Sequence, residues 1–102
     1  MPRRLAVTEG PLTGTTLELG RSPVLIGRSP ECTLVLADDY ASSRHARLVP
    51  QDGQWVLEDL GSTNGTTLAR SGRGTGEQVR GSARVGVGST IRIGRTTLEL
   101  QR

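Results

Sequence analysis

Apolar and polar residues alternate along most of the chain, the period-two pattern typical of β-strands that bury one face. Seven segments show this pattern, and each predicts a short strand: 15–20, 23–28, 33–38, 45–51, 54–60, 90–94 and 96–101. Turn-favouring residues gather between them, in stretches such as "QDG" and "STNG". No segment keeps helical spacing of its apolar residues for three turns. We therefore expect an all-β fold, either a sandwich or a barrel.

The length and composition fit a single domain covering residues 1–102. Leu, Val and Ile number 24 and Phe is absent, so the core must be aliphatic. No apolar run exceeds four residues, which argues against a transmembrane helix or a signal peptide within this segment. The one cysteine, Cys32, cannot form an internal disulfide, which fits a reducing compartment such as the cytoplasm. An anchor segment outside this stretch, tethering the chain to the inner face of a membrane, stays open.

The charge pattern bears on which partners the chain can bind. The formal net charge is +3, and all 13 basic residues are arginine, whose guanidinium suits phosphate and carboxylate. The arginines are scattered, and only Tyr40 and Trp55 are aromatic, which is little stacking surface for a single-strand nucleic-acid binder. Cys32 and His45 are the only soft metal ligands, too few for a zinc site. We expect no metal, no cofactor, no nucleic acid and no direct membrane contact by this segment.

Three short stretches place anion-binding groups where a strand meets a loop. They are "GR" at 27–28, "SSRH" at 42–45 and "STNG" at 62–65. Taken singly, each has an ordinary explanation as a surface charge, turn residues or a structural histidine. Loops at one end of a sandwich cluster in space, so together these groups would form a cradle for an anion. Ser42 and His45 are three apart in an extended segment and point to opposite faces, which argues against a hydrolytic triad and an enzyme.

Four blocks in this order resemble the forkhead-associated (FHA) domain family: "IGR", "SSRHARL", "LEDLGSTNGTTL" and "GSTIRIGRTTLEL". The resemblance extends from Leu5 to Leu100, so the domain core should span about residues 5–100. The stretches "LTGTTLELG" and "LADDYASSRHARL" further resemble the C-terminal domain of small actinobacterial membrane-anchored FHA proteins. The family implies an eleven-stranded β-sandwich that binds phosphothreonine peptides at its apical loops and has no catalytic activity of its own.

The resemblance also implies roles for individual residues. The expected peptide-binding residues are Arg28, Ser42, Ser43, Arg44, Thr63 and Asn64. The expected loop-shaping residues, which would support the site without touching ligand, are Gly27, His45 and Gly65. Arg28 and Ser42 would contact the phosphate, and Arg44 would add a basic contact. Thr63 would line the phosphothreonine pocket, whereas Asn64 and Ser43 would hydrogen-bond the peptide backbone.

Two further features concern the loops around this site. Tyr40 lies two residues before Ser42, and an exposed tyrosine there would contact an apolar side chain three places after the phosphothreonine. Asp38 and Asp39 beside it would repel an acidic side chain or attract a basic one; alternatively, Tyr40 packs inward. The stretch 69–82 departs from the family pattern and is the most loop-like part of the chain, which predicts a mobile excursion between two strands.

These observations predict a phosphothreonine-dependent adaptor in a Ser/Thr protein kinase pathway, linked to cell-envelope growth or division. Its partner would be a threonine-phosphorylated protein, either a kinase or a kinase substrate. One alternative is an FHA-like scaffold that binds partners through its sheet faces without phosphate, and a weaker one is a basic nucleic-acid-binding domain. The presence of Arg28, Ser42 and Asn64 favours the phosphate-dependent hypothesis over the scaffold.

Overall fold

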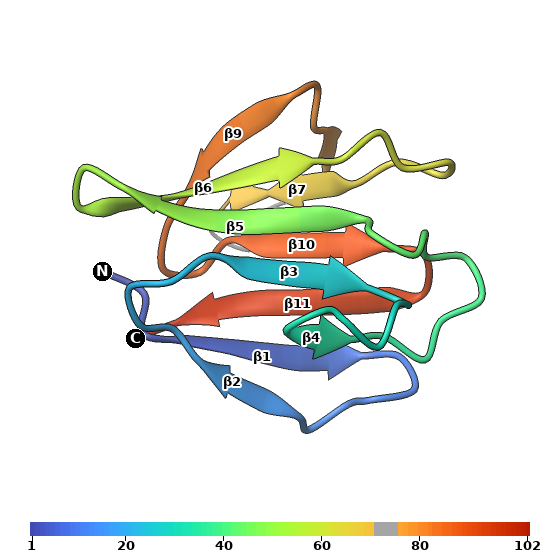
Figure 1. Cartoon of the computed structure of the whole chain (residues 1–102). Coiled ribbons are helices and arrows are strands. Elements are labelled where there is room, and N and C mark those ends of the chain that lie inside the picture. The colour runs from blue at the N-terminus through green and yellow to red at the C-terminus, as the bar shows by residue number, and fades with distance from the viewer. Residues whose placement is uncertain (71–75) are drawn as a thin grey trace.

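The computed structural model describes residues 1–70 and 76–102, in which eleven strands form two packed sheets (Figure 1). The six-stranded sheet has the order β2 (Thr16–Glu18), β1 (Arg4–Glu9), β11 (Thr96–Gln101), β10 (Thr90–Ile93), β7 (Thr67–Ala69) and β8 (Glu77–Gln78). The five-stranded sheet has the order β4 (Leu34–Val35), β3 (Val24–Gly27), β5 (Ala46–Gln51), β6 (Gln54–Asp59) and β9 (Ser82–Val85). Neighbouring strands are antiparallel except β3 and β4, which run parallel. The expectation of an all-β sandwich is confirmed, and the described residues contain no α-helix.

The β5–β6 hairpin shows how the sequence specifies this architecture. Its two-residue turn is Asp52-Gly53, and both residues have positive φ, 54° and 77°, as a type I′ turn requires. The register set by this turn places Leu48 opposite Leu57. Both leucines are fully buried between the sheets. A slip of one residue would expose them both, so the turn and the alternation specify the same pairing.

The core lies between the two sheets and is almost entirely aliphatic. Its largest fully buried apolar side chains are Trp55, Leu5, Ile26, Leu48, Leu57, Ile91, Ile93, Leu98 and Leu100. Full burial of one such side chain contributes about 1.5–3 kcal/mol. Leu5 and Leu100 are register partners across β1 and β11, so the core joins the beginning of the chain to its end.

The sequence pattern misses four strands, β1, β7, β8 and β9, and predicts a longer β4 than the structure contains. β1 does not alternate, because Leu5, Ala6 and Val7 are all buried. The expectation of a loop over 69–82 is wrong at both ends of that stretch. Near its C-terminal end β8 pairs with β7, and β9 begins at Ser82. The middle of that stretch, residues 71–75, lies outside the described residues. β7, β8 and β9 have only two to four residues each, too few for a clear alternating pattern.

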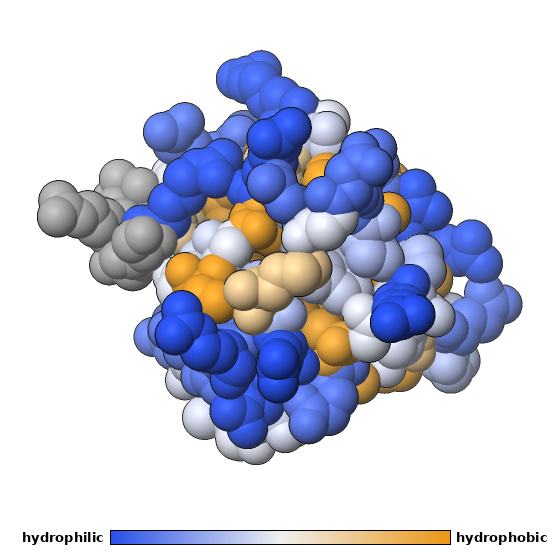
Figure 2. Space-filling model, turned by 90° about the vertical axis from the view of Figure 1, so that its left-hand side faces the viewer, coloured by the Kyte–Doolittle hydropathy of each residue, from blue (hydrophilic) through white to orange (hydrophobic). Residues whose placement is uncertain are grey.

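The two ends of the sandwich differ (Figure 1). Both termini lie at one end, where the N–H of Arg3 donates to the carbonyl of Gln101 at 2.8 Å. The β4–β5, β6–β7 and β10–β11 loops and the end of β3 lie at the other, which we call the loop end. Figure 2 views the terminal end, where separate apolar patches lie among hydrophilic side chains. Nowhere in residues 1–70 and 76–102 is there a helix long and apolar enough to cross a membrane.

Candidate functional site

Gly27 lets two loops approach each other closely. It ends β3, and a Cβ at this position would lie 2.9 Å from the carbonyl carbon of Ser43, closer than real Cβ atoms come to backbone. One residue further on, the N–H of Arg28 donates to the carbonyl of Ser42 at 3.0 Å. The end of β3 is thereby held against the β4–β5 loop, and the Arg28 backbone is fixed beside both serines.

The buried ring of His45 connects the β4–β5 loop to the β6–β7 loop from inside the protein. The side chain is fully buried. The N–H of Ser42 donates to its Nδ1 at 3.0 Å, and its Nε2 lies 2.9 Å from the carbonyl oxygen of Gly65. A neutral imidazole with its hydrogen on Nε2 satisfies both bonds at once. Gly65 has φ of +86°, a conformation that glycine adopts without strain and that aims this carbonyl at the ring.

Two more hydrogen bonds join the same loops at the surface. The N–H of Thr63 donates to Oγ of Ser42 at 3.1 Å. The Nδ2 of Asn64 donates to the carbonyl of Tyr40 at 2.9 Å. The positions of Thr63 and Asn64 are therefore fixed by the β4–β5 loop as well as by their own turn.

Asp59, at the end of β6, organises the β6–β7 loop and was missed by the sequence reasoning. Its Oδ1 accepts from the hydroxyls of Ser62 and Thr66, both at 2.6 Å, and its Oδ2 accepts from the N–H groups of Gly61 and Ser62, both at 3.1 Å. Burial alone would raise the pKa of Asp59, but the bonds from Ser62 and Thr66 outweigh it and hold that pKa below its ordinary value. These two hydroxyls therefore face inward and shape the loop. An aspartate followed by glycine and serine at the start of a turn was the available signal.

Asp38 plays the corresponding part in the β4–β5 loop, and it corrects an expectation. Its side chain is buried, with the residue 3% exposed. Oδ1 accepts from the N–H of Tyr40 at 2.9 Å, and Oδ2 accepts from the N–H of Arg95 and the hydroxyl of Thr96, both at 2.8 Å. Burial opposes ionisation, but these hydrogen bonds prevail and lower the pKa of Asp38. Asp38 is therefore not a surface charge acting on a ligand, whereas Asp39 is exposed.

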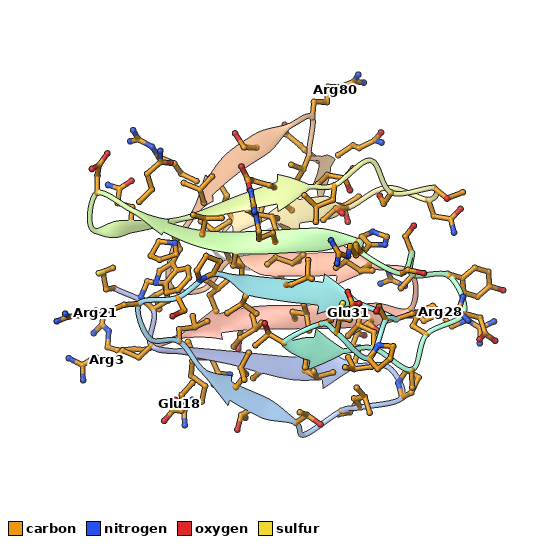
Figure 3. The ribbon with its side chains drawn as sticks, in the orientation of Figure 1. Arg3, Glu18, Arg21, Arg28, Glu31 and Arg80 are labelled. Carbon is orange, nitrogen blue, oxygen red and sulfur yellow. The ribbon has the colours of Figure 1, made fainter. Side chains whose placement is uncertain are left out.

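An open hollow of about 360 Å³ at the loop end brings together five of the six predicted peptide-binding residues. These five are Arg28, Ser42, Ser43, Thr63 and Asn64, and the remaining lining is Asp39, Tyr40 and Ala41. The Arg28 side chain is exposed, and no carboxylate among the described residues forms an ion pair with it. Figure 3 shows Arg28 projecting at the loop end of the ribbon.

Arg44 is the predicted residue that the structure places elsewhere. Its Nη2 lies 2.6 Å from Oε1 of Glu31, in an ion pair whose side chains are 63% and 67% exposed. Arg44 does not line the hollow that holds Arg28. An exposed pair of this kind is weak and can exchange partners.

The sequence allowed Tyr40 either to be exposed or to pack inward, and the structure places it on the surface. The residue is 48% exposed, so it is not part of an inward-packed loop core. The guanidinium carbon of Arg95 lies 5.0 Å from the ring centroid, within the range of a cation–π interaction. Tyr40 thus forms a wall between the hollow described above and the β10–β11 turn.

The fold is a β-sandwich, and its loop end brings together side chains of the kinds that bind anions. The loop end offers a guanidinium, hydroxyls and a carboxamide. Oγ of Ser42 accepts from the N–H of Thr63, and it is the backbone N–H of Ser42 that bonds the His45 ring. In the described part of the chain, no three His, Cys, Asp or Glu side chains gather to hold a metal ion. The chain belongs to the FHA domain family: residues 24–94 match the family's model. FHA domains are interaction modules and not enzymes.

Relatives support the actinobacterial resemblance. The FHA domain-containing protein FhaB of Mycolicibacterium smegmatis is 54% identical over 99 residues, which cover 97% of this chain and 60% of FhaB. FhaB of Mycobacterium tuberculosis is 52% identical over the same length and shares. The oxoglutarate dehydrogenase inhibitor of Corynebacterium diphtheriae is 35% identical over 94 residues, 92% of this chain and 61% of that protein. The chain thus spans about three fifths of the length of these curated relatives.

Solved structures share the fold. The FhaA FHA domain complexed with the intracellular domain of Rv3910 superimposes with a TM-score of 0.78 at 28% identity, covering 96% of this chain and 98% of that one. A structure from a study of phosphothreonine-dependent FHA domain interactions gives a TM-score of 0.79 at 27% identity, covering 97% and 94%. The family resemblance seen in the sequence is confirmed.

Proposed function

We propose that this domain binds protein segments that carry phosphothreonine and acts as an adaptor in a Ser/Thr protein kinase pathway. One observation carries the proposal: Arg28, hydroxyl groups and a carboxamide converge on one hollow at the loop end. These are groups that bind a phosphate and the extended peptide next to it. The phosphothreonine-dependent interactions studied in a structural neighbour support the same ligand class.

Arg28 and Ser42 are the proposed phosphate contacts. Arg28 is exposed and supplies a fixed positive charge with a planar fork of donors. Oγ of Ser42 already accepts from the N–H of Thr63, so its hydroxyl hydrogen is left to donate to a phosphate oxygen. Ser43 lines the same hollow and is a proposed contact to the peptide backbone. Arg44 reaches the phosphate by exchanging its exposed bond to Glu31.

Asn64 and Thr63 are the proposed contacts to the rest of the phosphothreonine segment. Asn64 donates its Nδ2 to the carbonyl of Tyr40, which orients the carboxamide oxygen to accept an N–H from the peptide backbone. Thr63 lies beside it in the hollow and forms the wall that the threonine methyl meets. Gly27, His45 and Gly65 hold these loops in place without contacting the ligand.

The expected affinity follows from the charges. A phosphate near neutral pH carries almost two negative charges, because its second pKa is about 6. Charge-assisted hydrogen bonds contribute about 1.5–3 kcal/mol each. Two or three of them, reduced by the entropy lost in ordering a flexible peptide, give micromolar binding of about −8 kcal/mol. Such binding is reversible and depends on the kinase.

Calorimetry with three ligands tests the proposal: a phosphothreonine peptide library, the same peptides without phosphate, and a single-stranded oligonucleotide. Binding restricted to the phosphorylated peptides supports the proposal. Equal binding of both peptide forms would favour a phosphate-independent scaffold that uses the sheet faces. Binding of the oligonucleotide alone would favour a nucleic-acid-binding domain.

The proposal extends to the setting of the whole protein. Residues 1–102 form a single FHA unit with its core at about 5–100, in line with the core cluster that runs from Leu5 to Leu100. The partner is a threonine-phosphorylated protein, a kinase or a kinase substrate, in a pathway linked to cell-envelope growth or division. Such partners place the domain in the cytoplasm, tethered to the inner face of the membrane if the full-length protein carries an anchor. No catalysis, cofactor or nucleic acid is involved.

A further inference from the structure

A second hollow, of about 400 Å³, adjoins the one that holds Arg28. Its lining residues are Tyr40, Asn64, Gly65, Thr67, Arg92, Gly94 and Arg95. Tyr40 and Asn64 line both hollows, so these two side chains separate one hollow from the other. A peptide whose backbone is held by Asn64 therefore has one hollow for its phosphothreonine and another for a neighbouring side chain.

The second hollow has two positively charged side chains in its wall. Among the described residues, Arg92 and Arg95 line it and no carboxylate does. The carboxylate of Asp38 lies behind the turn, bonded to the Arg95 N–H. Arg92 has one acidic neighbour, Glu9, at the long Nη1–Oε1 distance of 3.9 Å, and the same Oε1 accepts from the hydroxyl of Thr97 at 2.7 Å. Arg95 forms no ion pair within residues 1–70 and 76–102. Both arginines are exposed, so their charge is available to a ligand.

The Arg95 backbone is held in place by Asp38. The N–H of Arg95 donates to Oδ2 of that buried carboxylate, and the N–H of Tyr40 donates to Oδ1. Gly94, with φ of +59°, completes the tight β10–β11 turn, and a Cβ there would lie 2.7 Å from Oδ1 of Asp38. The guanidinium of Arg95 stacks over the Tyr40 ring, and its Nη2 donates to the tyrosine hydroxyl at 3.4 Å. The positive wall of this hollow is thus positioned before any ligand arrives.

We propose that Arg92 and Arg95 form a second anion-binding site, which receives a negatively charged side chain of the same phosphothreonine segment. The chemistry is that of a carboxylate or a second phosphate, since a guanidinium binds both. This inference rests on the proposed function and names the class of partner segment: one that carries a second negative charge near its phosphothreonine. It differs from the expectation of an apolar side chain beside Tyr40, because the side chains that face this hollow from the β10–β11 turn are arginines, whereas Asp38 is buried under the turn and bonded to backbone N–H groups.

A charge-scanned peptide series tests this site. Starting from one phosphothreonine peptide, Glu, phosphoserine or neutral Gln is placed in turn at each of the four positions on either side, and each peptide is titrated by calorimetry. The variant is the double substitution Arg92→Gln/Arg95→Gln. The matched control is Arg21→Gln, which removes the same kind of exposed charge at the terminal end (Figure 3).

We expect Glu or phosphoserine at one or two neighbouring positions to bind about fivefold tighter than Gln. This gain should vanish in the double variant, persist in the control and shrink as salt is raised. A gain with phosphoserine alone identifies a doubly phosphorylated partner, and a gain with both anions identifies an acidic one; either supports the site.

Two outcomes overturn the inference, and they are distinguishable. Phosphate-dependent binding with less than a twofold preference for any anion, or a preference unchanged in the double variant, refutes the second site and leaves the proposed function standing. Failure of every phosphopeptide to bind wild-type protein refutes the proposed function, and the second site with it.

Discussion

Replacing Asp59 with Asn tests whether the hydroxyl-rich β6–β7 loop is held from within. Four donors converge on the carboxylate of Asp59, the hydroxyls of Ser62 and Thr66 on one oxygen and two backbone N–H groups on the other. Asn has a single acceptor oxygen. Whichever way the new amide is turned, its NH₂ group faces two of these donors.

The magnitude follows from how many donors lose their acceptor. A buried donor left without an acceptor costs about 1–3 kcal/mol. Thr66 is fully buried, whereas Asp59 is half-buried, and a hydroxyl can rotate to accept from the new NH₂. We therefore expect Asp59→Asn to lower the free energy of unfolding by about 2 kcal/mol in total. For a domain of this size, that lowers the melting temperature by about 8–16 °C.

The effect should depend on pH, with a sign set by the lowered pKa of Asp59. A carboxyl whose pKa is lower in the folded than in the unfolded state stabilises the fold above the unfolded value, about 4. That stabilisation is lost as pH falls through the folded-state pKa. The difference in stability between wild type and Asp59→Asn should therefore be full above about pH 5 and shrink toward acid. The variant should keep part of the acid sensitivity of wild type, because the lowered pKa of Asp38 is present in both proteins.

Thermal melts at several pH values, paired with phosphopeptide calorimetry at low temperature, provide the assay. The control is Asp52→Asn, which removes a carboxylate from the exposed β5–β6 turn, where Asn also tolerates positive φ. This control should change stability by less than about 0.5 kcal/mol. Asp59→Asn should also weaken phosphopeptide binding, because Thr63 and Asn64 lie in the loosened loop. A variant that melts with the control and binds like wild type would refute the internal role of Asp59.

Three further substitutions separate binding from folding. Arg28→Ala should leave melting unchanged and weaken phosphopeptide binding about 30- to 150-fold, the equivalent of about 2–3 kcal/mol; a loss below threefold by calorimetry would mean that Arg28 is not on the phosphate. His45→Ala removes the partner of two backbone groups inside a packed site, so it should cost more stability than intrinsic affinity. A His45 variant that melts like wild type but cannot bind would contradict this assignment. Gly27→Ala should destabilise the domain and reduce binding together, because the new methyl meets the Ser43 carbonyl; unchanged melting in denaturation scans would count against that close approach.

Local patterning predicted those strands whose information lies in their own sequence. β5, β6, β10 and β11 alternate cleanly, and the Asp52-Gly53 turn specifies its hairpin register. The pattern missed β1 because three consecutive residues are buried. It missed β8 because that strand has only two residues, and β9 because its partner β6 is distant in the chain. The eleven-stranded count came from the family resemblance and not from periodicity.

The site divides in a similar way. Residues whose chemistry faces outward, such as Arg28 and Asn64, could be found from the resemblance to a known motif. The internal roles of Asp38 and Asp59 were not predicted, because a charged residue next to a turn is usually taken as exposed. In the structure both carboxylates bind backbone and hydroxyl groups within the protein. The position of Arg95 beside the site was not predicted, because only the fold brings the β10–β11 turn against the loop at Asp38, 57 residues earlier in the chain.

The pairing of the two chain ends has a mechanical consequence. β1 and β11 are antiparallel, and Arg4 is the register partner of Gln101 at the terminal end. Tension that pulls the termini apart therefore acts on this pair as on a zipper, loading its hydrogen bonds one after another from Arg4 toward Glu9. The peptide-binding loops lie at the far end of that zipper (Figure 1). A domain loaded in this way separates first at its two termini, and the loops of the proposed binding site are the last part to be loaded.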